Sequence, residues 1–165
     1  MAEINLPMSA MQKGDSLTLP EYKVVGEIDH YGFDDTADEG GIWRIGQLPA
    51  LAGSMTVDID LFATATSGTV EFGVQALAYS VGTDATAITA AAFATAVLSG
   101  NVSVSTTTLV PVRATVTLTT GAQQDSAATG DYFILKIYRD ASANPDGALS
   151  GDAEVCAVHL SYAAS

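Results

Sequence analysis

The chain has 165 residues, the size of a single globular domain, and 48% of them are hydrophobic, so a packed core is expected. Six Lys and Arg residues against nineteen Asp and Glu residues give a net charge of −13. This charge excludes the basic surface with which proteins bind nucleic acids or anionic membranes. The single cysteine, Cys156, excludes an intrachain disulfide and a cysteine-based zinc site.

The first twenty residues differ from the rest, since they have mixed polarity, two prolines and no clear period. We interpret residues 1–20 as an extended N-terminal arm and residues 21–165 as a β-sandwich domain. The segment lacks the basic and then apolar stretch of a secretory signal, and no run of about 18 apolar residues occurs in the sequence. We therefore expect a protein that is made in the cytoplasm.

Alternation of apolar and polar residues dominates the remaining sequence and predicts β-strands. The clearest pair joins residues 54–65 to residues 70–78 in a hairpin with a turn at Thr66–Gly68. The segment 84–93 is rich in alanine and is the only competing helix. In chain order, the predicted strands span 21–28, 41–48, 54–65, 70–78, 94–105 (divided at Gly100), 108–120, 131–140 and 153–162.

About eight antiparallel strands without long helices between them predict an all-β fold. The expected architecture is an antiparallel two-sheet sandwich of jelly-roll type. One face of the 54–65 strand carries Met55, Val57, Ile59 and Leu61, and we expect these side chains to form part of the core. The strand at 131–140 has apolar residues on both faces, so we expect both of its faces to be partly covered.

Two aspartates on one strand are the best candidates for catalysis. Asp58 and Asp60 lie two residues apart on the same face, a spacing compatible with the paired carboxylates of a glycoside hydrolase. No aromatic residues that would line a cleft accompany them, and neither His30 nor His159 lies in a recognisable nucleophile motif. We therefore expect no enzyme activity, no catalytic residue, no cofactor and no metal.

Two further features suggest contact with ligands or partners. The segment Glu27–Glu39 has six acidic residues without a Lys or Arg, which is typical of a solvated loop, a cation site or a contact for a basic partner. Tyr31 and Trp43 are candidates for a sugar-stacking platform, although one tryptophan between isoleucine and arginine is more typical of a core or interface anchor. Between Arg44 and Arg113 there is no Lys or Arg, which favours packing against other subunits.

The C-terminal third carries a pattern that we associate with one group of proteins. It consists of the strand Phe133–Asp140, the turn Pro145–Gly147, the segment Leu149–Ala153 and a last strand that ends Val158–Tyr162. This pattern resembles the closing strands of virion structural proteins of tailed bacteriophages, and the similarity extends in outline over residues 40–163. The resemblance implies a β-sandwich that decorates or cements a capsid.

These observations predict a capsid decoration (cement) protein that binds the outer capsid surface of the virion and stabilises the head. Its partners would be the major capsid protein and further copies of itself, as a homotrimer, with neither nucleic acid nor membrane. An alternative is a tail-associated or secreted carbohydrate-binding β-sandwich module that uses Tyr31 and Trp43, and a hydrolase with Asp58 and Asp60 ranks last. The residues predicted at the capsid or subunit interface are Ile4, Leu6, Met8, Met11 and Trp43.

Overall fold

The structure is a computed structural model of the chain. It describes residues 1–165 except 15–16, 49–50, 83, 85–90, 142–147 and 164–165. Most of the helix predicted at 84–93 and the turn predicted at 145–147 therefore lie outside the described residues. Within the described part, no helix is long and apolar enough to cross a membrane.

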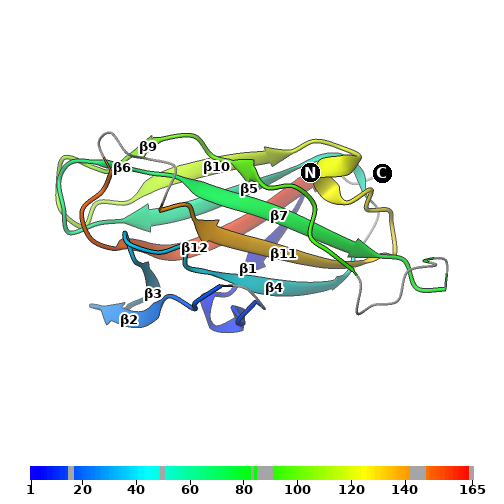
Figure 1. Ribbon diagram of the computed structural model, residues 1–165, viewed down its shortest axis with the longest axis horizontal. Coiled ribbons are helices and arrows are strands. Elements are labelled where there is room, and N and C mark those ends of the chain that lie inside the picture. Colours follow the sequence, from blue (N-terminus) through cyan, green and yellow to red (C-terminus); the bar gives the residue numbers. More distant parts are fainter. Residues whose placement is uncertain (15–16, 49–50, 83, 85–90, 142–147, 164–165) are drawn as a thin grey trace.

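The described residues form two antiparallel sheets that pack face to face, which confirms the predicted all-β sandwich (Figure 1). The first sheet has the order β10-β5-β12-β3-β2, and β1 also pairs with β12. The second sheet has the order β4-β11-β7-β8, and a short pair, β6 with β9, lies apart from both. Among the described residues, the 3-10 turns η1 (Met8–Ala10) and η3 (Ala122–Gln124) lie between strands.

Two of the predicted strands are divided differently in the structure. The predicted strand 21–28 becomes part of a hairpin of two strands, and the strand 94–105 becomes two short strands on either side of Gly100. The bounds are β1 Ala2–Leu6, β2 Glu21–Val25, β3 Ile28–Phe33, β4 Gly40–Gln47, β5 Ala52–Phe62, β6 Thr69–Val70, β7 Phe72–Tyr79, β8 Val97–Leu98, β9 Val102–Ser103, β10 Val112–Leu118, β11 Tyr132–Arg139 and β12 Ala153–Ala163.

The core lies between the two sheets and takes alternate residues from each strand. From β5 it receives Met55, Val57, Ile59 and Leu61, all fully buried as the alternation predicted. A β-bulge in β12 between Val155 and Ala157 interrupts the alternation of that strand. The bulge leaves Cys156 and Ala157 half-buried, while Val155 before them and Val158 after them are buried in the core.

The predicted hairpin between residues 54–65 and 70–78 is wrong. β5 pairs with β10 and β12 in the first sheet, whereas β7 pairs with β11 and β8 in the second sheet. The turn before β6 therefore carries the chain from one sheet to the other. Gly68 in this turn has φ +113°, and a Cβ atom there would lie 2.7 Å from the Cα of Leu149, so the crossing requires glycine.

Residues 1–20 pack against their own chain. β1 pairs along β12 from Ala2 opposite Tyr162 to Leu6 opposite Val158. It thereby covers backbone groups of β12 that would otherwise form part of an open sheet edge. Gln12 exchanges two backbone hydrogen bonds of 2.9 Å with Ile42 at the edge of β4. The segment thus adds a strand to the sandwich, while the division into an arm (1–20) and a domain (21–165) stays a prediction.

Four of the five predicted interface residues are buried within this sandwich. Leu6, Met8, Met11 and Trp43 have exposures of 2–7%, and Ile4 packs against the same core while it remains partly accessible. Their side chains therefore contact this chain's own core.

Candidate functional site

A groove of about 540 Å³ lies on the outer face of the second sheet, over β4, β11 and β7. The floor consists of residues that alternate with the buried ones, so their side chains point away from the core. In one row across the sheet, Leu77 of β7 lies opposite Ile134 of β11, which lies opposite Arg44 of β4. Two residues further along β11, on the same face of the sheet, Lys136 lies opposite Ile42 of β4.

Segments outside the sheet form the walls of this groove. The two hydrogen bonds between Gln12 and Ile42 hold the neighbouring residues Lys13 and Gly14 along one side. On the other side are Phe93 and Val81. Because the floor belongs to a hydrogen-bonded sheet, the shape of the groove is set before any ligand arrives.

Aromatic side chains stand at both ends of the groove. Tyr79 and Tyr132 are paired in register at one end, and Tyr132 is 50% exposed. At the other end, the Nζ of Lys136 lies 5.5 Å from the ring centroid of Phe93 and 5.6 Å from that of Tyr138, which are cation–π distances. The ring of Tyr138 lies across Gly73, where a Cβ atom would be 2.3 Å from the ring.

The groove also concentrates positive charge in an acidic protein. Lys13, Arg44 and Lys136 line it, which is half of the six Lys and Arg residues, and no Asp or Glu among the described residues lines it. Within the described part of the chain, none of the three forms an ion pair. Burial lowers the pKa of Lys136, and Asp38 acts in the opposite direction.

The predicted sugar platform of Tyr31 and Trp43 is not present. Trp43 is 2% exposed, and its Nε1 donates a hydrogen bond of 3.0 Å to the carbonyl oxygen of Pro7. Tyr31 belongs to β3 in the other sheet and packs edge-on against Tyr22, at 5.4 Å between ring centroids. Because the two rings lie on different sheets and one is inside the core, they cannot flank a common ligand.

Three carboxylates of the acidic segment Glu27–Glu39 form hydrogen bonds with backbone groups of the same chain. The carboxylates accept hydrogen bonds from backbone N–H groups: Asp35 from Gly151 at 2.7 Å, Asp38 from Ala141 at 3.0 Å and Glu39 from Asp34 at 2.8 Å. No cluster of three or more residues suited to a metal ion occurs among the described residues.

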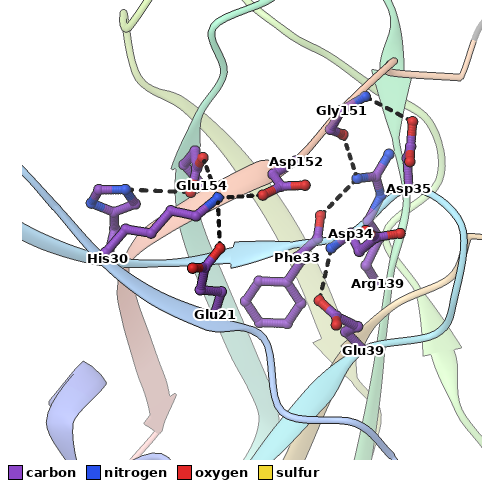
Figure 2. Close-up of polar contacts among 11 residues, drawn as sticks. Glu21, His30, Phe33, Asp34, Asp35, Glu39, Arg139, Gly151, Asp152 and Glu154 are labelled. Atoms are coloured by element: carbon purple, nitrogen blue, oxygen red, sulfur yellow. Dashed lines mark hydrogen bonds and ion pairs between the residues drawn. The ribbon is translucent and has the colours of Figure 1, made fainter.

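Next to this segment lies a buried arginine, Arg139 (Figure 2). Its guanidinium donates to the carbonyl oxygens of Phe33 and Gly151 at 2.8 Å and of Leu149 at 3.0 Å. Burial lowers the pKa of Arg139, whereas the surrounding carboxylates, led by that of Asp35, raise it. Arg139 therefore supplies a positive charge inside the chain for the acidic segment.

His30 is a buried residue of β3 beside Glu154 (Figure 2). Its Nε2 lies 3.3 Å from Oε2 of Glu154, and neither atom has a hydrogen-bond partner in the described part of the chain. Lys23 pairs with Asp152, Glu154 and Glu21, and its hydrogen bond to Asp152 raises the pKa of Lys23. This cluster joins β2, β3 and the start of β12.

Asp58 and Asp60 lie on the outer face of the first sheet, beside a hollow of about 250 Å³ that Asp58, Arg113 and His159 help to line. Arg113 donates to both carboxylate oxygens of Asp60, at 2.6 and 2.8 Å, and this lowers the pKa of Asp60. A glycosidase needs one carboxyl group with a raised pKa as its general acid. The arrangement gives the opposite shift and does not support the hydrolase alternative.

We expect the Arg113→Gln variant to raise the pKa of Asp60 towards its ordinary value, because the largest cause of the lowered value is removed. In the native protein, the pair stabilises the fold above the pKa of the unfolded chain, and this contribution is lost as the pH falls through the lower folded pKa. An NMR titration of the Asp60 carboxyl carbon in both proteins measures the shift. An unchanged pKa would contradict the assignment.

Comparison with known proteins finds no matching family model and no matching curated protein. The fold itself is that of carbohydrate-binding modules, which are non-catalytic β-sandwiches. The chain is similar to the family 35 module (CBM35) of Abf62 from Cellvibrio japonicus, with a TM-score of 0.51 and 8% identity, over 97% of this chain and 93% of that one. It is also similar to the C-terminal family 6 module (CBM6) of LamC, a marine laminarinase from Zobellia galactanivorans, with a TM-score of 0.50 and 11% identity, over 97% of this chain and 99% of that one.

These matches contradict the predicted resemblance to virion proteins of tailed bacteriophages. Two solved structures that share the fold over nearly the whole chain are carbohydrate-binding modules, and this contradicts the prediction of a capsid decoration protein. The major capsid protein and a capsid-bound homotrimer are no longer supported as partners. The alternative, a carbohydrate-binding module, agrees better with the fold, although the residues predicted for it do not form the site. A shared fold does not test the predicted location on a virion.

Proposed function

We propose that this protein is a carbohydrate-binding module that holds a glycan in the groove over β4, β11 and β7. The observation that carries the proposal is an open groove bordered by Tyr79, Phe93 and Tyr132 on the outer face of a sandwich that has the fold of such modules. Its volume of about 540 Å³ lies within the usual range of ligand sites.

The chemistry of the groove suits a sugar chain. Pyranose rings present apolar C–H faces, which pack on aromatic rings and on an apolar floor such as that of Leu77 and Ile134. The hydroxyl groups at the ring edges need hydrogen-bonding partners, which the tyrosine hydroxyls and the cationic side chains can offer. No carboxylate pair among the described residues lines the groove, so it is suited to binding without hydrolysis.

The proposal is tested by replacing Tyr132, the aromatic residue at the exposed end of the groove. We expect Tyr132→Ala to weaken glycan binding about tenfold, because it removes an aromatic contact worth about 1–2 kcal/mol. Binding is measured first on an array of plant, algal and bacterial glycans that includes laminarin, since LamC is a laminarinase, and then by calorimetry with the best ligand.

The matched control is Tyr22→Ala. Tyr22 is 53% exposed, close to the 50% of Tyr132, but it lies on β2 in the other sheet. We expect this variant to bind as the native protein does. An array without any bound glycan, or equal losses in the two variants, would overturn the proposal.

A further inference from the structure

We infer that the groove selects an acidic glycan, with an anionic group (a carboxylate or a sulfate ester) held between Lys136 and Arg44. This inference rests on the proposed function, because it names the class of sugar that the same groove would take. It is carried by three observations: where the cations of the chain lie, how they are arranged, and what surrounds them.

The first observation is the distribution of charge over the whole chain. The protein has a net charge of −13 and six Lys and Arg residues, each of which lies in the described part. Lys23 and Arg113 pair with carboxylates, and Arg139 is buried against backbone carbonyl groups. The remaining three are the ones that line the groove, and within the described part they form no ion pair, although the more distant charge of Asp38 acts on Lys136.

Chance is a poor explanation for this separation. Nineteen acidic side chains are available to pair with six basic ones, and none of the described acidic residues lines the groove. Cations that form no ion pair in a strongly acidic chain are available to an anionic group from outside.

The second observation is the geometry across the two strands. Lys136 lies opposite Ile42, and Arg44 lies two residues further along β4, so the two cationic residues are diagonal neighbours on the same face. Such neighbours are about 7 Å apart, which lets one anionic group contact both side chains. The guanidinium of Arg44 offers two parallel N–H donors, which match the two oxygens of a carboxylate or sulfate group.

The third observation is the surroundings of these charges. The ammonium group of Lys136 lies over the rings of both Phe93 and Tyr138, and the cross-strand neighbour of Lys136 is the apolar residue Ile42. An ion pair in a partly dry, apolar setting is stronger than one in open water. The same rings can pack on the sugar while the cation binds the acid group, so a single glycan unit would satisfy both features.

Distant acidic residues do not cancel this attraction under physiological conditions. At 0.15 M ionic strength, the Debye length is about 8 Å, so repulsion from carboxylates elsewhere on the surface is largely screened. Contacts within the groove are shorter than this length and are screened less. The local cations therefore decide the sign of the interaction.

The experiment compares three probes and two charge-removing variants of the full chain. The probes are polygalacturonate, which carries carboxylates, λ-carrageenan, which carries sulfate esters, and laminarin, which is neutral. The variants are Arg44→Gln, in the groove, and Arg113→Gln, which removes the same charge from the outer face of the first sheet. Dissociation constants are measured by calorimetry at 0.15 M salt, and thermal unfolding verifies that each variant is folded.

We expect the native protein to bind at least one acidic probe ten times more tightly than laminarin. Arg44→Gln should weaken the binding of that probe about tenfold, which equals about 1.4 kcal/mol, and weaken laminarin binding by a clearly smaller factor, because glutamine loses the charge but still offers hydrogen bonds to sugar hydroxyls. Arg113→Gln should leave both affinities nearly unchanged. Binding of polygalacturonate alone identifies a carboxylate as the anionic group, and binding of λ-carrageenan alone identifies a sulfate ester.

Two results would overturn the inference and leave the proposed function standing. One is that laminarin binds as tightly as both acidic probes, with Tyr132→Ala still weakening it. The other is that Arg44→Gln and Arg113→Gln have equal effects on the acidic probe. A glycan array without any bound sugar would overturn the proposed function itself, and this inference with it.

Discussion

The Arg139→Met variant is expected to lose about 3–5 kcal/mol of its free energy of unfolding, the cost of removing one partner from a buried charged network. Arg139 is 3% exposed, and its guanidinium serves three backbone carbonyl groups from two separate segments. Methionine has a similar volume but no donor, so these carbonyl groups lose partners that water cannot replace. The carboxylates around the arginine also lose its positive charge.

Urea unfolding followed by the fluorescence of Trp43 measures this loss, because Trp43 is the only tryptophan and is buried. The control is Arg113→Met, which removes an exposed arginine whose ion pair with Asp60 contributes less than about 1 kcal/mol. If the two variants unfold at the same urea concentration, the structural role assigned to Arg139 is wrong.

The Gly68→Ala variant is expected to destabilise the fold by about 3 kcal/mol or more, from backbone strain together with overpacking. At φ +113° an alanine is strained, and its Cβ would lie 2.7 Å from the Cα and 3.0 Å from the backbone nitrogen of Leu149. Backbone atoms cannot rotate away as a side chain can. The segment around Leu149 would have to move, although it is tied to residue 69 by a backbone hydrogen bond of 2.8 Å.

The matched control for this variant is Gly130→Ala. Gly130 also has a positive φ, +91°, but no atom lies within 4 Å of the position of its Cβ. The difference in thermal unfolding midpoint between the two variants therefore isolates the contact with Leu149 from the strain of the φ angle. Equal midpoints would show that the crossing tolerates a side chain.

The sequence predicted which face of a strand is buried better than it predicted which strands lie side by side. Alternation in β5 identified Met55, Val57, Ile59 and Leu61 as buried, because one side of the strand faces a core whatever the topology. The same pattern does not say which strand lies alongside, and a short turn at Thr66–Gly68 was therefore mistaken for a hairpin. The strand pairing of β5 and β7 shows that the chain changes sheets there, and Gly68 packs at this crossing against Leu149, far away in the sequence.

The groove could not be predicted because its residues come from separate strands. Tyr79 and Tyr132 become neighbours only through the pairing of β7 with β11. One signal was present, since β11 has Ile134 on the face opposite Phe133 and Leu135, which indicates a second apolar surface. The aromatic residue that stood out in the sequence, Trp43, belongs instead to the core.

The role of the acidic segment was also hidden in the sequence. Six acidic residues without a Lys or Arg within Glu27–Glu39 indicated repulsion and solvent exposure. The compensating charge, Arg139, lies a hundred residues further along the chain, and β11 brings it to the end of β3. Composition reports local charge density, whereas the fold determines which distant group neutralises it.

The pairing of β1 with β12 has a consequence for how the chain folds during its synthesis. β1 is translated before β12, and it can take its place in the sheet only after β12 has been made. Until then, Leu6 and Met8 have no finished core to enter, and nascent chains expose them to chaperones and to one another. Pairing of β1 with β12 is thus expected late in folding, and its rate depends on contacts between segments that lie far apart in the sequence.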